Sequence, residues 1–506
     1  MTAPSAEPLP RTTALPPVAR GGLALAGAVV AGVLVAVSGR YGFHRDELYF
    51  LEAGRHLAFG YVDQPPLTPL LARAADMLFG GSLVGLRLAP AIAAGLVVVV
   101  AGLMARELGG GRDAQLLAAA ATGVSSVLLV TGHMLSTTTF DLLAWAAVTW
   151  LLLRALRDGG RWWLWAGLAA GIGLQNKTLV AVLLAAVGVG LLALGPRAVL
   201  RTPWPWAAVA IMLVIWAPNL VWQAVNGWPQ LALSAAIAAG SSGTSEPWYV
   251  FLPFQLLLVS PLLVPVWAIG LWRLLREPAL RPYRALGAAY PLLALLFTVT
   301  GGKPYYLAGL YPLLLAAGSE PVARWVRRTA PRPRAALVGL ALVLSAAVNA
   351  VLMLPLVPVA QLADTPVVDV NYDAGETVGW PELVATVAAV HAGLPAAERA
   401  TAVILTGNYG EAGAVDHLGR GLGLPAAYSG HNAYADWGPP PAGAAPVITV
   451  GYELERLGRW FGECTEGARV DNGVNLQNDE QGARVHVCRE LRRPWSETWP
   501  QLRHVG

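Results

Sequence analysis

Apolar segments dominate this chain between residues 21 and 357, with short polar connections between them. A helix that crosses a bilayer needs about 20 mostly apolar residues, because lipid offers no hydrogen-bond partner to an exposed backbone group. The mean hydropathy of +0.52 and the charged fraction of 13% agree with membrane insertion, since soluble domains carry about 25% charged residues. We therefore predict a mainly α-helical, polytopic membrane protein with about eleven spans. These cover residues 21–37, 83–105, 114–131, 139–156, 162–174, 178–195, 205–222, 249–272, 285–300, 304–319 and 335–357.

Arginine is concentrated in every second connection between the predicted spans. Cytoplasmic connections are enriched in Lys and Arg, so this pattern places the N-terminus in the cytoplasm and, with an odd number of spans, the C-terminal part outside the plasma membrane. The first outer loop, about residues 40–82, is an exception that carries arginines of its own. The net charge of +4 is scattered and forms no basic face, which argues against a nucleic-acid partner. The basic connections lie near residues 106–112, 154–161, 197–201, 273–284 and 324–334.

Three parts differ in composition. Residues 1–20 are rich in Pro, Ala and Thr and are expected to be a disordered cytoplasmic tail, whereas residues 21–358 form the transmembrane part. Residues 359–506 contain short β-rich runs, at 402–405, 447–450 and 485–487, between helix-like stretches, which predicts a small exterior α/β domain. The only two cysteines, Cys464 and Cys488, fall in this last part. They are consistent with a disulfide in an oxidising compartment, and two buried thiols are the alternative.

Carboxylates gather in the first outer loop. The stretch that begins at Asp46 and Glu47 predicts a short helix with acids in its first turn, and Asp63 with the prolines after it predicts the start of another. Both helices would lie along the membrane surface. Asp46 and Asp63 are therefore candidates for catalysis, and the alternative is that they only cap these helices.

Other polar residues fall at predicted outer ends of spans. The only two lysines, Lys177 and Lys303, both lie there, as does His133, and Tyr305 and Tyr306 follow Lys303. An ionisable group near the membrane is costly unless it is paired, hydrated or functional. The lysines are candidates for phosphate binding, with snorkelling at the interface as the alternative. His133 could equally be a helix-end polar residue, and the tyrosines could belong to an interfacial aromatic belt.

This set of residues suits sugar transfer from a lipid phosphate to a hydroxyl. A carboxylate is needed to take the hydroxyl proton, and cations or a metal are needed to stabilise the departing phosphate. A solute or lipid transporter could use similar groups and is the alternative function. Against it, the two halves show no internal repeat, and the candidate residues cluster at one face rather than at mid-span.

Three motifs resemble a known family. Asp46-Glu47 with Tyr49, Gly60-Tyr-Val-Asp-Gln-Pro-Pro-Leu67, and Gly302-Lys-Pro-Tyr-Tyr-Leu307 resemble bacterial membrane glycosyltransferases of the C-type fold. The resemblance is to families 39 and 83, which are related to the protein O-mannosyltransferases and to the aminoarabinose transferase that modifies lipid A. It covers roughly residues 20–320.

The resemblance implies roles for single residues. Asp46 matches the family's catalytic aspartate, Glu47 its acidic neighbour, and Asp63 the carboxylate that holds a divalent metal in some relatives. Gln64 departs from the family's usual Lys or His, which leaves the metal role open. No organic cofactor is expected. The implied activity is inverting transfer of a sugar from a polyprenyl-phosphate donor to a lipid, glycan or protein acceptor on the outer face. The candidate substrate-binding residues are Lys177, Lys303, Tyr305, Tyr306 and His133.

Overall fold

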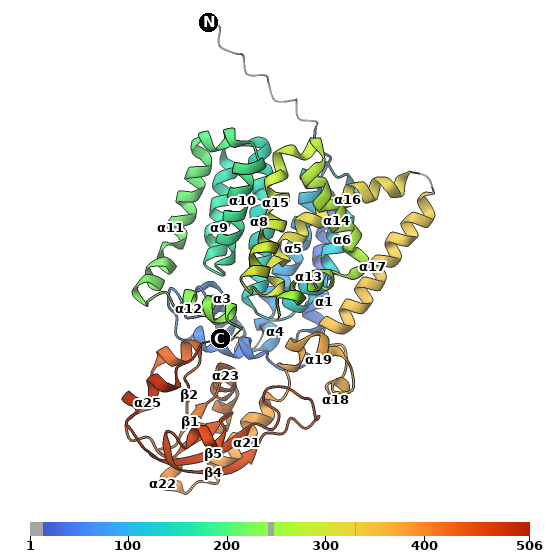
Figure 1. Ribbon diagram of the computed structural model, residues 1–506. Coiled ribbons are helices and arrows are strands. Elements are labelled where there is room, and N and C mark those ends of the chain that lie inside the picture. The colour runs from blue at the N-terminus through green and yellow to red at the C-terminus, as the bar shows by residue number, and fades with distance from the viewer. Residues whose placement is uncertain (1–13, 241–246, 329, 506) are drawn as a thin grey trace.

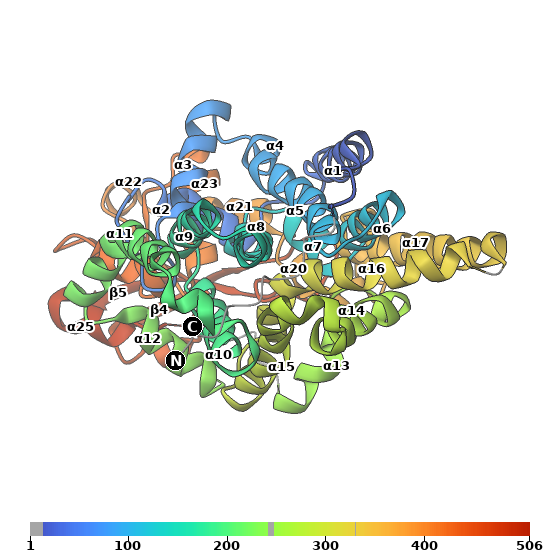
Figure 2. The ribbon, with the colours of Figure 1, turned by 90° about the horizontal axis from the view of Figure 1, so that it is seen from above.

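The computed structural model describes residues 14–240, 247–328 and 330–505. Helices built from the apolar segments stand side by side in a bundle (Figures 1 and 2), because each buries its Leu, Val and Ala side chains against its neighbours. The helices of the bundle are α1 (Arg20–Val37), α5 (Leu88–Glu107), α6 (Arg112–Gly123), α7 (Ser126–Gly132), α8 (Thr137–Asp158), α9 (Arg161–Leu174), α10 (Leu179–Leu194), α11 (Pro203–Val225), α13 (Phe251–Leu257), α14 (Val264–Arg276), α15 (Arg284–Val299), α16 (Tyr311–Arg327) and α17 (Pro331–Met353).

The predicted polytopic helical fold is confirmed, and the number of spans stays a prediction. Within the described ranges, six helices are long and apolar enough to cross a membrane, and two bent helix pairs raise that number to as many as eight. Helices α9, α10 and α16 have only 14, 16 and 17 residues but lie within the same bundle (Figure 1). Helix α17 stands at its side (Figure 2), with only 11% of its most apolar window buried.

Glycines allow several helix pairs to approach closely. A Cβ atom added at Gly318 of α16 would overlap the carbonyl oxygen of Val266 in α14, and one at Gly270 of α14 would overlap the backbone of α16. At the crossing of α1 and α5, a Cβ at Gly27 would lie 2.8 Å from the carbonyl oxygen of Gly95. Small residues at such crossings let helices pack in lipid, where no hydrophobic force drives them together.

The first loop forms three short helices between α1 and α5: α2 (Arg45–Ala53), α3 (Leu67–Phe79) and α4 (Leu83–Leu86). The N-cap of α2 is His44, whose side chain accepts from the Asp46 N–H, and Glu47 completes a capping box by accepting from the His44 N–H. Pro66, not Asp63, is the residue before α3. The alternative that Asp46 and Asp63 are helix caps is therefore wrong, since neither side chain satisfies the N-terminal N–H groups of a helix.

A five-stranded sheet confirms the predicted C-terminal α/β fold. Its order is β2-β1-β3-β5-β4, with β1 parallel to β2 and β3, and β5 antiparallel to β3 and β4. The predicted β-rich runs at 402–405, 447–450 and 485–487 overlap β1, β3 and β5. The elements are α21 (Trp380–Ala392), β1 (Val403–Thr406), α23 (Tyr409–Leu418), β2 (Ala427–Ser429), β3 (Val447–Val450), β4 (Phe461–Arg469), β5 (Arg484–Leu491) and α25 (Trp495–Leu502).

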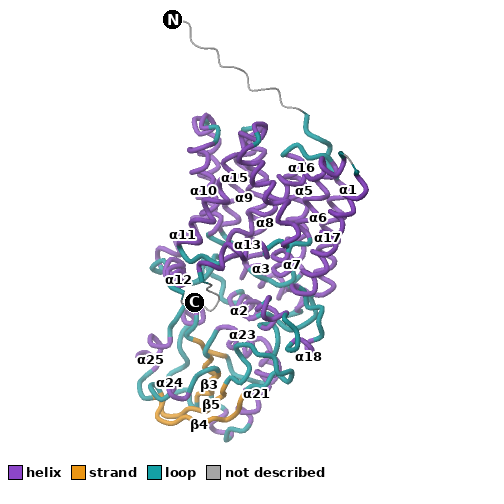
Figure 3. Tube along the Cα trace, turned by 45° about the vertical axis from the view of Figure 1, so that its right-hand side comes forward, coloured by secondary structure: helices purple, strands orange, loops and turns teal. Residues whose placement is uncertain are grey.

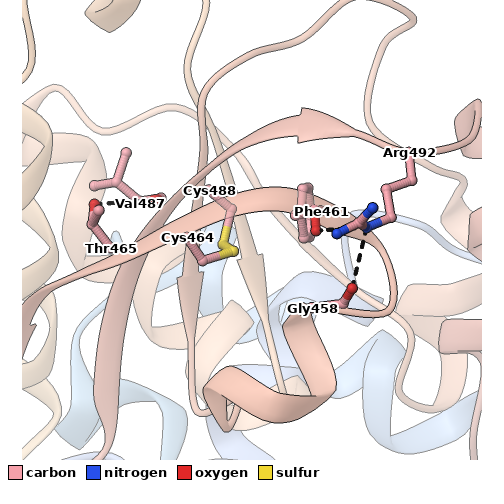
Figure 4. The surroundings of a disulfide bond; sticks show 7 residues. All are labelled: Gly458, Phe461, Cys464, Thr465, Val487, Cys488 and Arg492. Carbon is pink, nitrogen blue, oxygen red and sulfur yellow. Dashed lines mark hydrogen bonds between the residues drawn. A yellow bond between two sulfur atoms is a disulfide. The ribbon is translucent and has the colours of Figure 1, made fainter.

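A disulfide bond joins Cys464 of β4 to Cys488 of β5 (Figure 4), where the two residues stand opposite each other in the antiparallel register. The bond fastens the edge strand β4, and so the alternative of two buried thiols is wrong. Beside it, Arg492 donates to the carbonyl oxygens of Gly458 and Phe461. These contacts hold the end of the pair where β4 begins and β5 ends.

The α/β region lies against the first loop. Helices α2 and α23 lie between the sheet and the bundle (Figure 3), and a Cβ at Gly413 of α23 would come within 2.9 Å of the Leu48 backbone in α2. Leu48 shares one buried apolar cluster with Trp380 of α21 and Ile404 of β1. Figure 1 places this junction at the end of the bundle opposite the start of α1.

Candidate active site

The candidate site lies where the first loop, two bundle connections and the α/β region meet. Asp46 is half-buried in the first turn of α2, and its Oδ1 accepts a hydrogen bond of 2.8 Å from the Tyr409 hydroxyl at the start of α23. Asp63, in the segment before α3, accepts a 2.9 Å bond at Oδ1 from the Tyr49 hydroxyl. Each of these two carboxylates is thus held by one tyrosine.

Asp63 can hold a proton near neutral pH. Its burial and the negative charge of nearby Asp46 raise the pKa of Asp63 to about 7, although the hydrogen bond from Tyr49 acts in the opposite direction. Burial favours the neutral form of a carboxyl group, and a like charge does the same. The two carboxylates are therefore close enough to influence each other, as in sites where two acids divide proton-transfer roles.

Glu47 differs from its neighbour Asp46. It is completely buried and accepts two bonds from Arg87, at 2.9 Å to Oε1 and 2.7 Å to Oε2. The backbone N–H groups of Leu135 and His44 donate to the same two oxygens, at 2.8 and 2.9 Å. Burial alone would raise the pKa of Glu47, but Arg87 and these N–H groups hold it below its usual value. Both oxygens are occupied, so the geometry favours a structural ion pair.

Arg87 was not predicted as a site residue, although an arginine at the outer end of the predicted span 83–105 is an exception to the topology rule. Its side chain is 1% exposed and also donates to the carbonyl oxygens of Ser38 and Gly42. It therefore ties the end of α1 to the start of α2 and fixes the path of the first loop. A buried arginine with all its partners supplied is stable, whereas an unpaired one is costly.

The structure brings Lys177 together with two of the predicted tyrosines. Its Nζ donates to Thr138 Oγ1 at 3.2 Å and lies 5.0 and 5.6 Å from the ring centroids of Tyr305 and Tyr306. Lys177 follows α9, whereas the tyrosines belong to the short 3₁₀ helix η5 (Pro304–Leu310) before α16. A lysine over aromatic faces is stabilised as a cation.

Lys303 is half-buried immediately before η5. Burial lowers the pKa of Lys303, and the negative charges of Asp46 and Asp373 oppose that shift. Burial also lowers the pKa of Lys177; the charges of Asp141 and Asp46 oppose that shift, and the charge of Lys303 adds to it. Two lysines and Asp46 thus share one electrostatic environment at this end of the bundle.

His133 is placed differently from the lysines. It is the C-cap of α7, is 7% exposed, and its Nδ1 lies 3.2 Å from the Leu129 carbonyl oxygen of its own helix. This contact favours the alternative that His133 is a helix-end polar residue.

A set of charged residues next to Asp46 was not predicted. Nη1 of Arg45 lies 3.0 Å from Glu376 and 3.1 Å from Asp479, and Nε2 of His44 lies 3.6 Å from Asp373. Burial would lower the pKa of His44, but Asp373 and the other carboxylates raise it to about 9. The sequence carried no signal for these pairs, because the partners are separated by more than 300 residues.

A metal role for Asp63 stays a prediction. In the part of the chain that the structure describes, no group of three or more His, Cys, Asp or Glu side chains could hold a metal ion.

Known proteins resemble this chain in sequence and in fold. Residues 63–222 match the family described as dolichyl-phosphate-mannose-protein mannosyltransferase. A curated relative from Pseudomonas fluorescens (strain Pf0-1), undecaprenyl phosphate-alpha-4-amino-4-deoxy-L-arabinose arabinosyl transferase 1, is 26% identical over 310 residues. That alignment covers 55% of this chain and 52% of the relative, so the matched region spans about half the length of the relative.

Two solved structures cover almost the whole chain. The crystal structure of ArnT from Cupriavidus metallidurans in the apo state has a TM-score of 0.63 at 16% identity, and the same protein bound to undecaprenyl phosphate has 0.57 at 18%. Each match covers 93% of this chain and 98% of the other. The agreement includes the bundle and the C-terminal region together. The chain therefore has the C-type fold of membrane glycosyltransferases, which is the fold that the resemblance predicted.

Proposed function

We propose that this protein is an integral-membrane glycosyltransferase that moves a sugar from a polyprenyl-phosphate donor to a hydroxyl of a lipid, glycan or protein acceptor. The observation that carries the proposal is the gathering of Asp46, Asp63, Lys177 and Lys303 at one end of a C-type fold. A relative whose name states transfer from an undecaprenyl-phosphate sugar, and a similar structure that binds undecaprenyl phosphate, support this donor class. They favour the transferase over the transporter.

In the proposed mechanism, Asp46 takes the proton of the acceptor hydroxyl while that oxygen bonds to the anomeric carbon of the sugar. The bond from the anomeric carbon to the phosphate oxygen breaks, and its electron pair leaves with the lipid phosphate. Attack from the opposite side inverts the anomeric centre. Lys177 and Lys303 stabilise the negative charge on the departing phosphate. Lysine suits this role because it presents a compact charge.

Glu47 has a positioning role in this scheme. Its bonds to Arg87 and its part in the capping box fix the first turn of α2, which carries Asp46. Asp63, whose pKa is raised to about 7 mainly by burial, can keep a proton near neutral pH and hold or release it beside Asp46. A preorganised site of this kind needs little rearrangement at the moment of reaction.

We further propose that the site faces the outside of the plasma membrane, with residues 21–358 as the catalytic part and 359–506 as the exterior part. Support comes from the other end of the bundle, where Arg106, Arg154 and Arg157 surround Glu107. Such arginine clusters are typical of the cytoplasmic side. The disulfide at the opposite end is typical of an oxidising compartment.

The proposal is tested by incubating the purified protein with a panel of polyprenyl-phosphate sugars and candidate acceptors and measuring release of the lipid phosphate. We expect release with one donor class and only when an acceptor is present. Parallel reactions with added divalent metal or with EDTA decide whether turnover needs a metal. Absence of turnover with every donor, together with labelling of cysteines introduced at the site from both sides of the membrane, would support the transporter instead.

A further inference from the structure

The C-terminal α/β region reaches directly into the candidate site. Strand β1 ends at Thr406 and α23 begins at Tyr409, so Tyr409 lies at the carboxyl edge of a parallel strand. Ligands of open α/β sheets bind outside this edge. Here the position is occupied by the first loop, and the Tyr409 hydroxyl donates to Oδ1 of Asp46 at 2.8 Å.

The backbone at Tyr409 is held firmly. Asn408 caps α23 by accepting from the Glu411 N–H at 2.9 Å, and the Glu411 carboxyl group accepts from the N–H groups of Gly407 and Asn408 at 2.8 and 3.2 Å. This reciprocal capping box fixes the first turn of the helix. The Tyr409 side chain is therefore attached to a rigid helix end rather than to a flexible loop.

The ring of Tyr409 is enclosed by side chains from both parts of the molecule. The Arg45 guanidinium lies 5.1 Å from the ring centroid, and the rings of Tyr49 and His431 lie 4.7 Å from it. Burial and the charge of Asp46 raise the pKa of Tyr409 well above its usual value, so the hydroxyl group stays a donor. Packing on three partners limits the ring to one orientation.

A second contact of the same kind reaches Asp63. The Ala433 N–H of the α/β region donates to the Tyr49 hydroxyl at 3.4 Å, and that hydroxyl donates to Asp63 Oδ1 at 2.9 Å. Because the Tyr49 and Tyr409 rings also contact each other, both candidate carboxylates depend on how the α/β region lies on α2.

We propose that Tyr409 is a positioning residue for Asp46, so that the transferase site is complete only with the α/β region docked on the first loop. The inference rests on the proposed function. The Tyr409 bond occupies Oδ1 and leaves proton transfer to Oδ2. The α/β region thereby contributes to catalysis by fixing the orientation of Asp46.

The test compares Tyr409→Phe with Tyr452→Phe in the full-length protein. Tyr452 is a buried tyrosine of the same region whose hydroxyl donates to the Thr406 carbonyl oxygen at 3.1 Å, away from the first loop. We expect Y409F to lower kcat by about 10- to 100-fold, the range for losing one hydrogen bond to a charged group, with little change in the KM of the donor. Y452F should keep the kcat of the wild type.

The split between kcat and KM separates positioning from general damage. In Y409F, kcat should fall while the KM values of donor and acceptor and the melting temperature stay near those of the wild type, because only the orientation of Asp46 is lost. A merely structural defect would lower the melting temperature together with the activity. Equal kcat values for wild type and Y409F would overturn the proposal.

A stability measurement keeps the inference independent of the proposed function. If wild type transfers no sugar from any donor, the proposed function fails, and a double-mutant cycle of Y409F and Asp46→Ala in thermal unfolding then decides the contact, because alanine leaves no acceptor for the Tyr409 hydroxyl. A non-additive cycle supports the bond between the α/β region and α2. Strictly additive effects would overturn it.

Discussion

The helical bundle and the junction between the first loop and the α/β region are held together in different ways. In the bundle, glycines such as Gly270 and Gly318 bring backbones together, and apolar side chains fill the rest. At the junction, Tyr409 and Arg45 bind carboxylates more than 300 residues away, and beside it Arg87 binds Glu47 within the first loop. Shape complementarity suffices where the surroundings are lipid, whereas a reaction site needs directed polar contacts. Four substitutions examine this difference.

Replacement of the central carboxylate should separate activity from stability most clearly. Asp46→Asn removes the proposed base but keeps the size of the side chain and an oxygen for Tyr409. We expect transfer to fall by about 10²- to 10⁴-fold, the usual contribution of a general base, with thermal unfolding nearly unchanged. Release of lipid phosphate measures the transfer activity, and a melting curve in detergent measures the thermal stability. The control is Asp76→Asn, in the same loop but paired with Arg55 and Arg73, which should keep full activity. Near-wild-type turnover of D46N would contradict the assignment of Asp46 as the base.

Replacement of the buried Arg87 should show that its ion pair with Glu47, in the first loop beside the junction, is structural. Arg87→Met leaves Glu47 buried without its cation, and we expect a loss of about 3–5 kcal/mol in the free energy of unfolding. Arg73→Met is the control, because the Arg73 side chain is 39% exposed and lies 3.7 Å from Asp76, a pair worth about 0–1 kcal/mol. Similar melting temperatures for the two variants would mean that the Glu47–Arg87 pair contributes little.

The bundle should respond to added volume rather than to charge. Gly318→Ala places a methyl group against the Val266 backbone, so α14 and α16 must separate, at a cost of about 1–3 kcal/mol. Gly339→Ala in α17 meets nothing within 4 Å and should be neutral or stabilising by about 0.5–1 kcal/mol through helix propensity. Melting curves of the two variants provide the comparison. Equal effects would show that close approach does not matter at the α14–α16 crossing.

The smallest expected effect concerns an acid of the junction that has no partner. Glu480 is 2% exposed, and its two carboxyl oxygens make no hydrogen bond among the described residues. The pKa of Glu480 is raised to about 9, mainly by burial and in addition by the negative charges of Glu376 and Glu411. The folded state therefore binds this proton more tightly than the unfolded state, and the associated stability is complete below about pH 4.5 and is lost as pH rises toward 9.

Glu480→Gln removes this pH dependence, because glutamine stays neutral. The variant should match the melting temperature of the wild type near pH 5 and exceed it by a few degrees near pH 9. Glu455→Gln, on an exposed part of the same region, should show no such trend. A constant difference between E480Q and wild type across this pH range would refute the buried-acid interpretation.

Much of the architecture could be predicted because membrane insertion constrains each segment separately. Apolar runs at 21–37 and 139–156 became α1 and α8 almost residue for residue. Strand β4 was missed because its sequence, Phe461–Arg469, is polar and lies at the edge of the sheet. Its pairing depends on β5 and on the disulfide, neither of which gives it a local pattern.

The candidate site was predictable only in part. Lys177 could be found because a lysine at an outer membrane edge is unusual whatever surrounds it. Asp46 was found mainly through its match to the catalytic aspartate of the family that the sequence resembles. Arg87 and Tyr409 could not be found, because the local sequence around an arginine or a tyrosine does not show whether it contacts a distant residue. The Tyr409–Asp46 bond joins residues 363 positions apart, and only the docking of α23 on α2 creates it.

The sequence by itself determined a polytopic helical protein with polar residues gathered at one face, because the bilayer requires apolar helices and penalises every unpaired charge. Only the tertiary structure decided what the neighbouring acids Asp46 and Glu47 do. Successive residues of a helix point about 100° apart, so Glu47 faces Arg87 in the interior and Asp46 faces Tyr409 in the candidate site. That division depends on packing between distant segments, which no local pattern records.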